Sequence, residues 1–99
     1  MQLIPEKNEM YTKHAAIRMQ QRAVPPLIVE WLSEFGAEAH DGRGAVRRYF
    51  DHKGRKRLES AVGSVVVERL NEYLDAYLVE KLDGTVITVG RRTRRIGRP

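Results

Sequence analysis

Residues 73–91 read YLDAYLVEKL-DG-TVITVGR, and they carry the clearest structural signal in the chain. Two runs rich in β-branched, aromatic and leucine side chains flank an Asp-Gly pair, which is the strongest short sequence signal for a β-hairpin. A two-residue loop at positions 83–84 then determines which residues face each other across the hairpin. The expected pairs are Leu82–Thr85, Val79–Thr88, Tyr77–Gly90 and Asp75–Arg92.

The two faces of this hairpin differ in polarity. Alternating side chains give one apolar face, which we expect to pack against helices. The tyrosines of the other face are either ordinary strand formers that cover the sheet or, if that face is open, platforms for stacking bases. The apolar face carries Leu74, Ala76, Leu78, Ile87 and Val89. The mixed face carries Tyr73, Asp75, Tyr77, Val79, Thr88 and Arg92.

Two helices are expected near the N-terminus, after a loosely held lead-in over residues 1–11. Thr12 is placed to cap the first helix, which ends before Pro25 because a residue that precedes proline avoids the helical conformation. Pro25-Pro26 starts the second helix, where a missing N–H costs nothing, and Gly36 ends it. Its apolar residues recur at helical spacing: Leu27, Ile28, Trp31, Leu32 and Phe35. Its polar edge, formed by Glu30, Glu34 and Glu38, faces either the first helix or water.

The middle of the chain has a weaker pattern. HDGRG at 40–44 is an expected loop, and AVRRYF at 45–50 is an expected strand. Residues 52–62 fit either a strand after a turn or a helix capped by Asp51. We favour the helix and expect it to continue past Gly63, because four apolar residues repeat every four positions. These residues are Leu58, Val62, Val66 and Leu70.

Together these elements predict an α+β fold, with N-terminal helices packed on a small antiparallel sheet that ends in a β-hairpin. The 99 residues predict one domain, 1–99, with a core over 12–92 and a basic tail over 93–99. The absence of cysteine excludes disulfides, thiolate metal sites and cysteine chemistry. No stretch approaches the roughly 18 apolar residues of a membrane span, and no signal peptide is recognisable. We therefore expect a soluble cytoplasmic protein without membrane contacts.

The positive charge is concentrated at the C-terminal end. Five arginines and no acid lie in the last nine residues, and the remaining 13 basic residues equal the 13 acidic residues. The net charge of +5 therefore belongs to this end, which would contact a polyanion or an acidic protein partner, or would act only as a solubilising end. The five arginines are Arg91, Arg92, Arg94, Arg95 and Arg98.

The first helix carries a polar stripe. His14, Arg18 and Arg22 are spaced by four residues and share one face with Gln21. A guanidinium binds phosphate through a planar fork of donors, and an imidazole titrates near neutral pH. The stripe therefore suits phosphate chemistry, although a solvated face of an amphipathic helix has the same pattern.

Two segments carry a family resemblance. HAAIRMQQR (14–22), followed by a proline-led helix, and YLVEKLDGTVITVGRRTRRI (77–96) resemble a family of short bacterial proteins. Members of that family open with an H-A-x-x-R-M-x-x-R helix and close with an I-T-V-x-x-R strand. The likeness covers roughly residues 12–96 and is loose over 38–64. The family in turn is distantly similar to the RelE and BrnT ribonuclease toxins.

That resemblance implies an enzyme that cleaves RNA without a metal or cofactor and that is often paired with an antitoxin. Matched residue by residue, it implies a catalytic group in which His14 transfers the proton and arginines hold the phosphate. Tyr77 would help to orient the phosphate through its hydroxyl, and His40 or His52 would be the second titrating group. Arg91 stands where relatives often have histidine. The catalytic group is His14, Arg18, Arg22, Thr88 and Arg92.

Binding to RNA is expected to involve further basic and aromatic residues. The histidines lack the spacing of metal ligands, so no metal site is expected. The alternatives are a non-catalytic module that grips nucleic acid or an acidic protein with the same basic face, and a dimer formed through Trp31 and Phe35. The expected nucleic-acid-binding residues are Arg47, Arg48, Tyr77, Arg91, Arg94 and Arg95.

Overall fold

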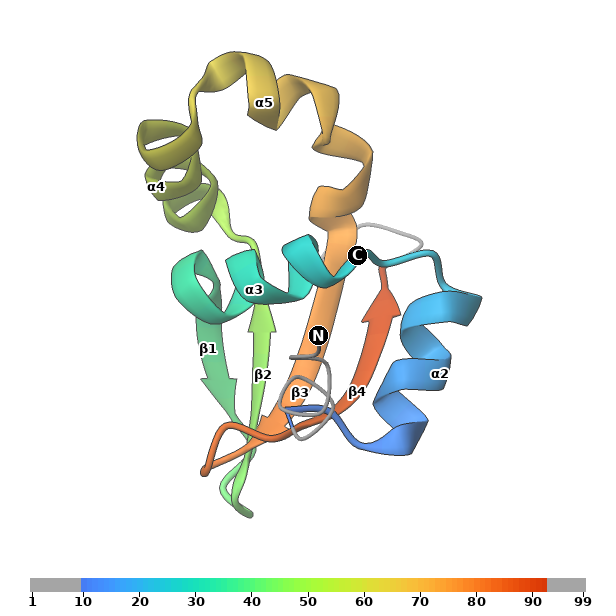
Figure 1. Cartoon of the computed structure of the whole chain (residues 1–99). Coiled ribbons are helices and arrows are strands. Elements are labelled where there is room, and N and C mark those ends of the chain that lie inside the picture. The colour runs from blue at the N-terminus through green and yellow to red at the C-terminus, as the bar shows by residue number, and fades with distance from the viewer. Residues whose placement is uncertain (1–9, 93–99) are drawn as a thin grey trace.

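The computed structural model describes residues 10–92, and these form an α+β fold in which the two N-terminal helices lie on one face of a four-stranded antiparallel sheet and the later helices lie beyond one end of the strands (Figure 1). This arrangement confirms the predicted fold class and the C-terminal hairpin. The strand order is β1-β2-β3-β4. The strands are β1 (Ala37–His40), β2 (Ala45–Tyr49), β3 (Ala76–Lys81) and β4 (Val86–Arg91). The helices are α2 (Lys13–Gln21), α3 (Pro26–Phe35), α4 (His52–Val62), α5 (Ser64–Arg69) and the 3-10 helix η1 (Asn71–Asp75).

The two N-terminal helices begin and end where the sequence predicts. The Thr12 hydroxyl accepts a hydrogen bond from the Ala15 amide at 3.0 Å and caps α2. Pro26 is the first residue of α3, and Gly36 follows its last turn. Gly36 has an extended rather than a left-handed backbone, and its lack of a side chain matters for another reason. A Cβ there would lie 2.6 Å from the Leu32 carbonyl oxygen.

The segment 52–62 is helical, as favoured, but the helix does not continue past Gly63. The Asp51 carboxylate accepts a hydrogen bond from the Gly54 amide at 2.7 Å and caps α4. Gly63 has φ of 97°, which interrupts the helix and starts α5 in a new direction. Leu58 is fully buried whereas Val66 is 38% exposed, so the four-residue repeat does not form one continuous face.

Strand β1 is a feature that the sequence analysis missed. Its residues, AEAH, lack the β-branched side chains that mark strands, and they pair with β2 from Ala37–Tyr49 to His40–Val46. Residue 40 is therefore in the strand rather than in the predicted loop. Glu38 is also in β1 and not on the polar edge of α3, and it forms an ion pair with Arg48 at 2.9 Å.

The hairpin of β3 and β4 has the predicted register away from the turn, but the turn itself differs from the prediction. Tyr77 is paired with Gly90, and Val79 with Thr88, as expected. The loop contains three residues instead of two, because the Lys81 amide donates to the Thr85 carbonyl. Gly84 supplies the positive φ of 93° that such a loop needs.

A β-bulge in β4 compensates for this longer loop. Glu80 is paired with Val86 and Val79 with Thr88, so Ile87 is the extra residue. The bulge restores the register, and it moves Ile87 off the apolar face. Val86 takes the buried position and is 3% exposed. The prediction for Ile87 was therefore wrong.

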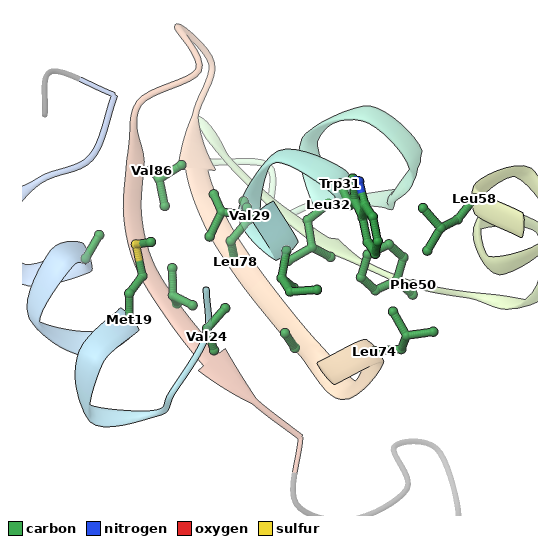
Figure 2. Packing of buried hydrophobic residues seen from close by; sticks show 14 residues of the cluster. Met19, Val24, Val29, Trp31, Leu32, Phe50, Leu58, Leu74, Leu78 and Val86 are labelled. Atoms are coloured by element: carbon green, nitrogen blue, oxygen red, sulfur yellow. The ribbon is translucent and has the colours of Figure 1, made fainter. Parts of the chain in front are cut away.

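The core lies between the sheet and the helices. Trp31 is only 7% exposed, and Figure 2 shows it close to Leu32 and Phe50. A buried Trp31 removes the main support for a dimer formed through an exposed Trp31 surface. The core cluster is Ala15, Met19, Val24, Ile28, Val29, Trp31, Leu32, Phe50, Leu58, Leu74, Ala76, Leu78, Val86 and Val89.

The outer edge of β4 is occupied by the segment that leads into α2. The Val86 amide donates to the Met10 carbonyl, and the Thr12 amide donates to the Val86 carbonyl, both at 2.9 Å. Met10 and Tyr11 are thus bound to the sheet, which differs from the loose lead-in expected for them. Because of this attachment, α2 lies alongside β4 (Figure 1). None of the helices in residues 10–92 has the length and apolar composition required to cross a membrane.

Candidate nucleic-acid interface

One face of the sheet is free of helices within the described part of the chain, and we call it the open face. Helix α3 packs against β2 and β3, and α2 packs against β4. Strand residues that point toward the helices are mostly buried, whereas those of alternate parity are exposed or half-buried, apart from Gly90. The open face is formed by Ala37, Ala39, Ala45, Arg47, Tyr49, Tyr77, Val79, Lys81, Thr88, Gly90 and Arg92.

The open face is basic. It contains three cationic side chains, from Arg47, Lys81 and Arg92, and the strand residues that form it include no aspartate or glutamate. A basic surface without carboxylates attracts polyanions, because each bound phosphate releases counterions without competition from a neighbouring acid.

Two tyrosines lie on the open face beneath arginines. Tyr49 on β2 is the direct neighbour of Tyr77 on β3, so the two aromatic side chains are side by side on adjacent strands. The Arg47 guanidinium carbon lies 5.2 Å from the centroid of the Tyr77 ring. The Arg92 guanidinium carbon lies 5.4 Å from the centroid of the Tyr49 ring. Both are cation–π contacts, in which the guanidinium is attracted to the electron-rich face of the ring.

Arg48 lies on the opposite face of the sheet, although it directly follows Arg47. Its Nε donates to Glu80 at 2.7 Å, and a second nitrogen is 2.9 Å from Glu38. A hydrogen bond with His40 and the charge of Arg48 hold the pKa of Glu38 below its usual range. The Arg48 guanidinium is thus occupied by two carboxylates, and it points away from the open face.

The side chains of Arg91 and Arg92 also have different partners. The chain over residues 71–75 is a 3-10 helix. The Arg92 amide nevertheless donates to the Asp75 carbonyl at 2.8 Å, so the two residues face each other as expected, but the Asp75 carboxylate forms no ion pair with the Arg92 side chain. Instead, the Arg91 Nε donates to Asp75 at 2.9 Å, and another Arg91 nitrogen donates to the Glu72 carbonyl at 2.6 Å. The facing pair Asp75–Arg92 is therefore present in the backbone, while the carboxylate of Asp75 binds Arg91 and the Arg92 side chain is directed to Tyr49.

The polar stripe of α2 is exposed, as its spacing indicates. The Arg18 Nε lies 3.4 Å from the His14 Nε2, and its Nη1 lies 3.3 Å from the Gln21 amide oxygen. The arginine is the donor and the His14 Nε2 is the acceptor. Arg22 is the C-cap residue, just past the last helical residue.

The stripe lies on the flank of α2 that faces away from α3. Ala16 and Gln20 line a pocket of about 490 Å³ together with Pro26, and so face the start of α3. At roughly 100° per residue, His14 and Arg18 are on the opposite flank of the helix. Within residues 10–92, no hydrogen bond or ion pair joins this stripe to the open face. The predicted catalytic residues therefore fall into two groups on neighbouring elements.

Sequence reasoning missed two residues of the open face. Tyr49 and Lys81 have the same strand parity as Arg47 and Tyr77, so the alternation in β2 and β3 was the signal that could have identified them. Arg94 and Arg95 lie outside the described residues. In the described part of the chain, no three histidine, aspartate or glutamate side chains gather to hold a metal ion.

Comparisons of the chain with protein-family models, with curated proteins and with solved structures found no match. The resemblance to RelE-type and BrnT-type toxins therefore rests on the sequence motifs alone.

Proposed function

We propose that this protein is a cytoplasmic RNA-binding protein that holds a single strand on the open face of its sheet. The observation that carries the proposal is the pairing of two arginines with two neighbouring tyrosines on a face whose strand residues include no carboxylate. Arginine and lysine side chains supply contacts to phosphate, and aromatic rings supply contacts to bases. A face with both kinds of side chain fits a single strand better than an acidic protein, which offers no bases.

The separation of Arg47 from Arg48 supports the same proposal. If the basic residues only raised solubility, a guanidinium on either face would serve equally well. Instead, the arginine on the helix-covered face is matched by two carboxylates, while those on the open face contact aromatic rings. Positive charge on the open face is therefore available to an external anion.

The test compares two variants that each remove two positive charges. Arg47→Gln with Arg92→Gln removes the guanidiniums of the open face. Lys53→Gln with Lys56→Gln is the matched control, because both lysines are exposed on α4. Fluorescence anisotropy of a labelled single-stranded RNA is measured over a series of KCl concentrations.

The expected result is a smaller salt dependence for the open-face variant only. Each phosphate contact to a single strand adds about 0.7 to the slope of log K against log salt, so two lost contacts lower the slope by about 1.4. The α4 control keeps the parental slope. Equal slopes for the two variants would contradict the proposal, because the charge would then act without regard to its position.

Metal-independent cleavage of the bound RNA, as in RelE-like toxins, is a second candidate function. The observation that favours it is that α2 packs along β4, which contributes Thr88 to the open face and leads directly to Arg92. His14 on the exposed flank of α2 is an imidazole that could transfer a proton to or from the RNA. An antitoxin would be the corresponding protein partner.

The cleavage hypothesis is tested by incubating total RNA with the purified protein in the presence of EDTA. Cleavage that persists in EDTA, disappears in His14→Ala and remains in Gln20→Ala would support it. Gln20 is the matched control because it is exposed on the other flank of α2. No cleavage by the parent, with salt-dependent binding intact, would leave a non-catalytic RNA-binding module.

A further inference from the structure

Gly90 makes room for the ring of Tyr77. A Cβ at residue 90 would lie 2.6 Å from the Tyr77 Oη, 2.7 Å from Cζ and 2.8 Å from Cε1. The phenol ring therefore lies across β4 at this point, and Gly90 is buried under it although it belongs to the open face. The described glycines with positive φ do not include Gly90, so its backbone does not require glycine. The requirement comes from the ring.

A ring that lies against the sheet presents one of its faces outward. One side of the Tyr77 ring is taken by Gly90. Arg47 is stacked over the ring, with its guanidinium carbon 5.2 Å from the centroid. Arg47 is an exposed residue, and no ion pair holds it in the described part of the chain. The Arg47 guanidinium can therefore leave the Tyr77 ring, while the ring stays against Gly90.

We propose that Tyr77, laid flat by Gly90, stacks one unpaired nucleobase, and that Arg47 moves from the ring to the adjoining phosphate. The inference rests on the proposed function and adds to it the ring that stacks the base and the arginine that leaves this ring for the phosphate. A base and a guanidinium compete for the same aromatic face, but phosphate offers the guanidinium a second, charge-assisted partner. Bases inside a duplex are already stacked on both faces, so the site selects single strands.

The test separates contacts with bases from contacts with phosphate. Affinities are measured for a short single-stranded RNA, for the same RNA in a duplex and for inorganic polyphosphate, which has no bases. Tyr77→Leu removes the platform, and Gly90→Ala forces the ring off the sheet. Tyr73→Leu is the control, because Tyr73 also lies under an arginine but on the helix side, beside α2. Trp31 fluorescence reports folding of every variant, since Trp31 is buried in the core.

We expect Tyr77→Leu to weaken binding of the single strand by about 5- to 150-fold, the usual effect of losing one base–aromatic stack. Gly90→Ala should weaken it in the same direction, and Tyr77→Phe should restore most of what Tyr77→Leu loses. Binding of polyphosphate should not change in these variants, and Tyr73→Leu should bind the single strand as the parent does.

Three results would overturn the inference, and they can be told apart. If folded Tyr77→Leu binds the single strand as tightly as the parent, the ring stacks no base, while the proposed RNA binding stands. If the parent itself fails to bind the single strand, the proposed function fails and the inference fails with it. Equal affinity of the parent for single strand and duplex also counts against the inference.

Discussion

Replacement of Gly54 by alanine in α4 should destabilise the protein, although helix propensity alone predicts the reverse. Alanine is more favourable than glycine inside a helix by about 0.8–1 kcal/mol. In this structure, however, a Cβ at residue 54 would lie 2.6 Å from the Phe35 carbonyl oxygen and 3.0 Å from Oδ1 of Asp51. The first contact is with backbone, so α4 must move away from the end of α3.

The size of the effect follows from these two contacts. Forcing an extra carbon into a packed site costs about 1–3 kcal/mol, and disturbing the Asp51 cap costs about 1 kcal/mol. Subtracting the helix-propensity gain leaves a net loss of about 1–3 kcal/mol. Urea unfolding followed by Trp31 fluorescence measures it, with Ser60→Ala, at an exposed position of α4, as the control. A Gly54→Ala protein more stable than its parent would refute the reasoning about this contact.

Three further predictions concern stability. Leu58→Ala should lower the free energy of unfolding by about 2–5 kcal/mol in urea titrations, because Leu58 is fully buried in the core cluster; a loss below 1 kcal/mol would contradict this packing. Arg48→Met should lower the free energy of unfolding by about 3 kcal/mol, because the buried Glu80 carboxylate then lacks its guanidinium partner. Arg48→Met combined with Glu80→Leu should recover most of that loss. Equal stability of the single and double variants would refute this. Hydrogen bonds from Thr85 hold the pKa of Asp83 below its usual 3.8, so the stabilisation is complete above that value and is lost as the pH falls through the lowered pKa. Asp83→Asn should show less loss of thermal stability between neutral and acidic pH, and an unchanged pH profile would argue against it.

Much of the fold could be predicted because local signals and burial agree in the helices and in the C-terminal hairpin. Thr12 caps α2 and Pro26 opens α3, and both signals are contained in a few neighbouring residues. Strand β1 could not be found in this way, because AEAH becomes a strand only through its pairing with β2. The length of the hairpin loop could not be predicted either. Asp-Gly suits both a two-residue and a three-residue loop. Because the bulge at Ile87 compensates for the extra loop residue, the pairs away from the turn are the same for either loop.

The candidate site could be predicted only in part for a related reason. The stripe on α2 follows from helical spacing within one element. The distinction between Arg47 and Arg48 requires knowledge of which face of the sheet the helices cover. The different surroundings of Arg91 and Arg92 depend on η1, which replaces the expected beginning of β3 and brings Asp75 to Arg91. Side chains adjacent in sequence therefore have different partners.

NMR titration with single-stranded RNA shows directly whether the open face is the RNA-binding surface. Backbone amide signals and tyrosine ring signals of the full chain would be followed while a short unlabelled single-stranded RNA is added. We expect the largest shifts on β2, β3 and β4, including the tyrosine rings, and centred on Arg47, Tyr49, Tyr77 and Thr88. Shifts confined to α4 and α5, with the open face unchanged, would contradict this expectation.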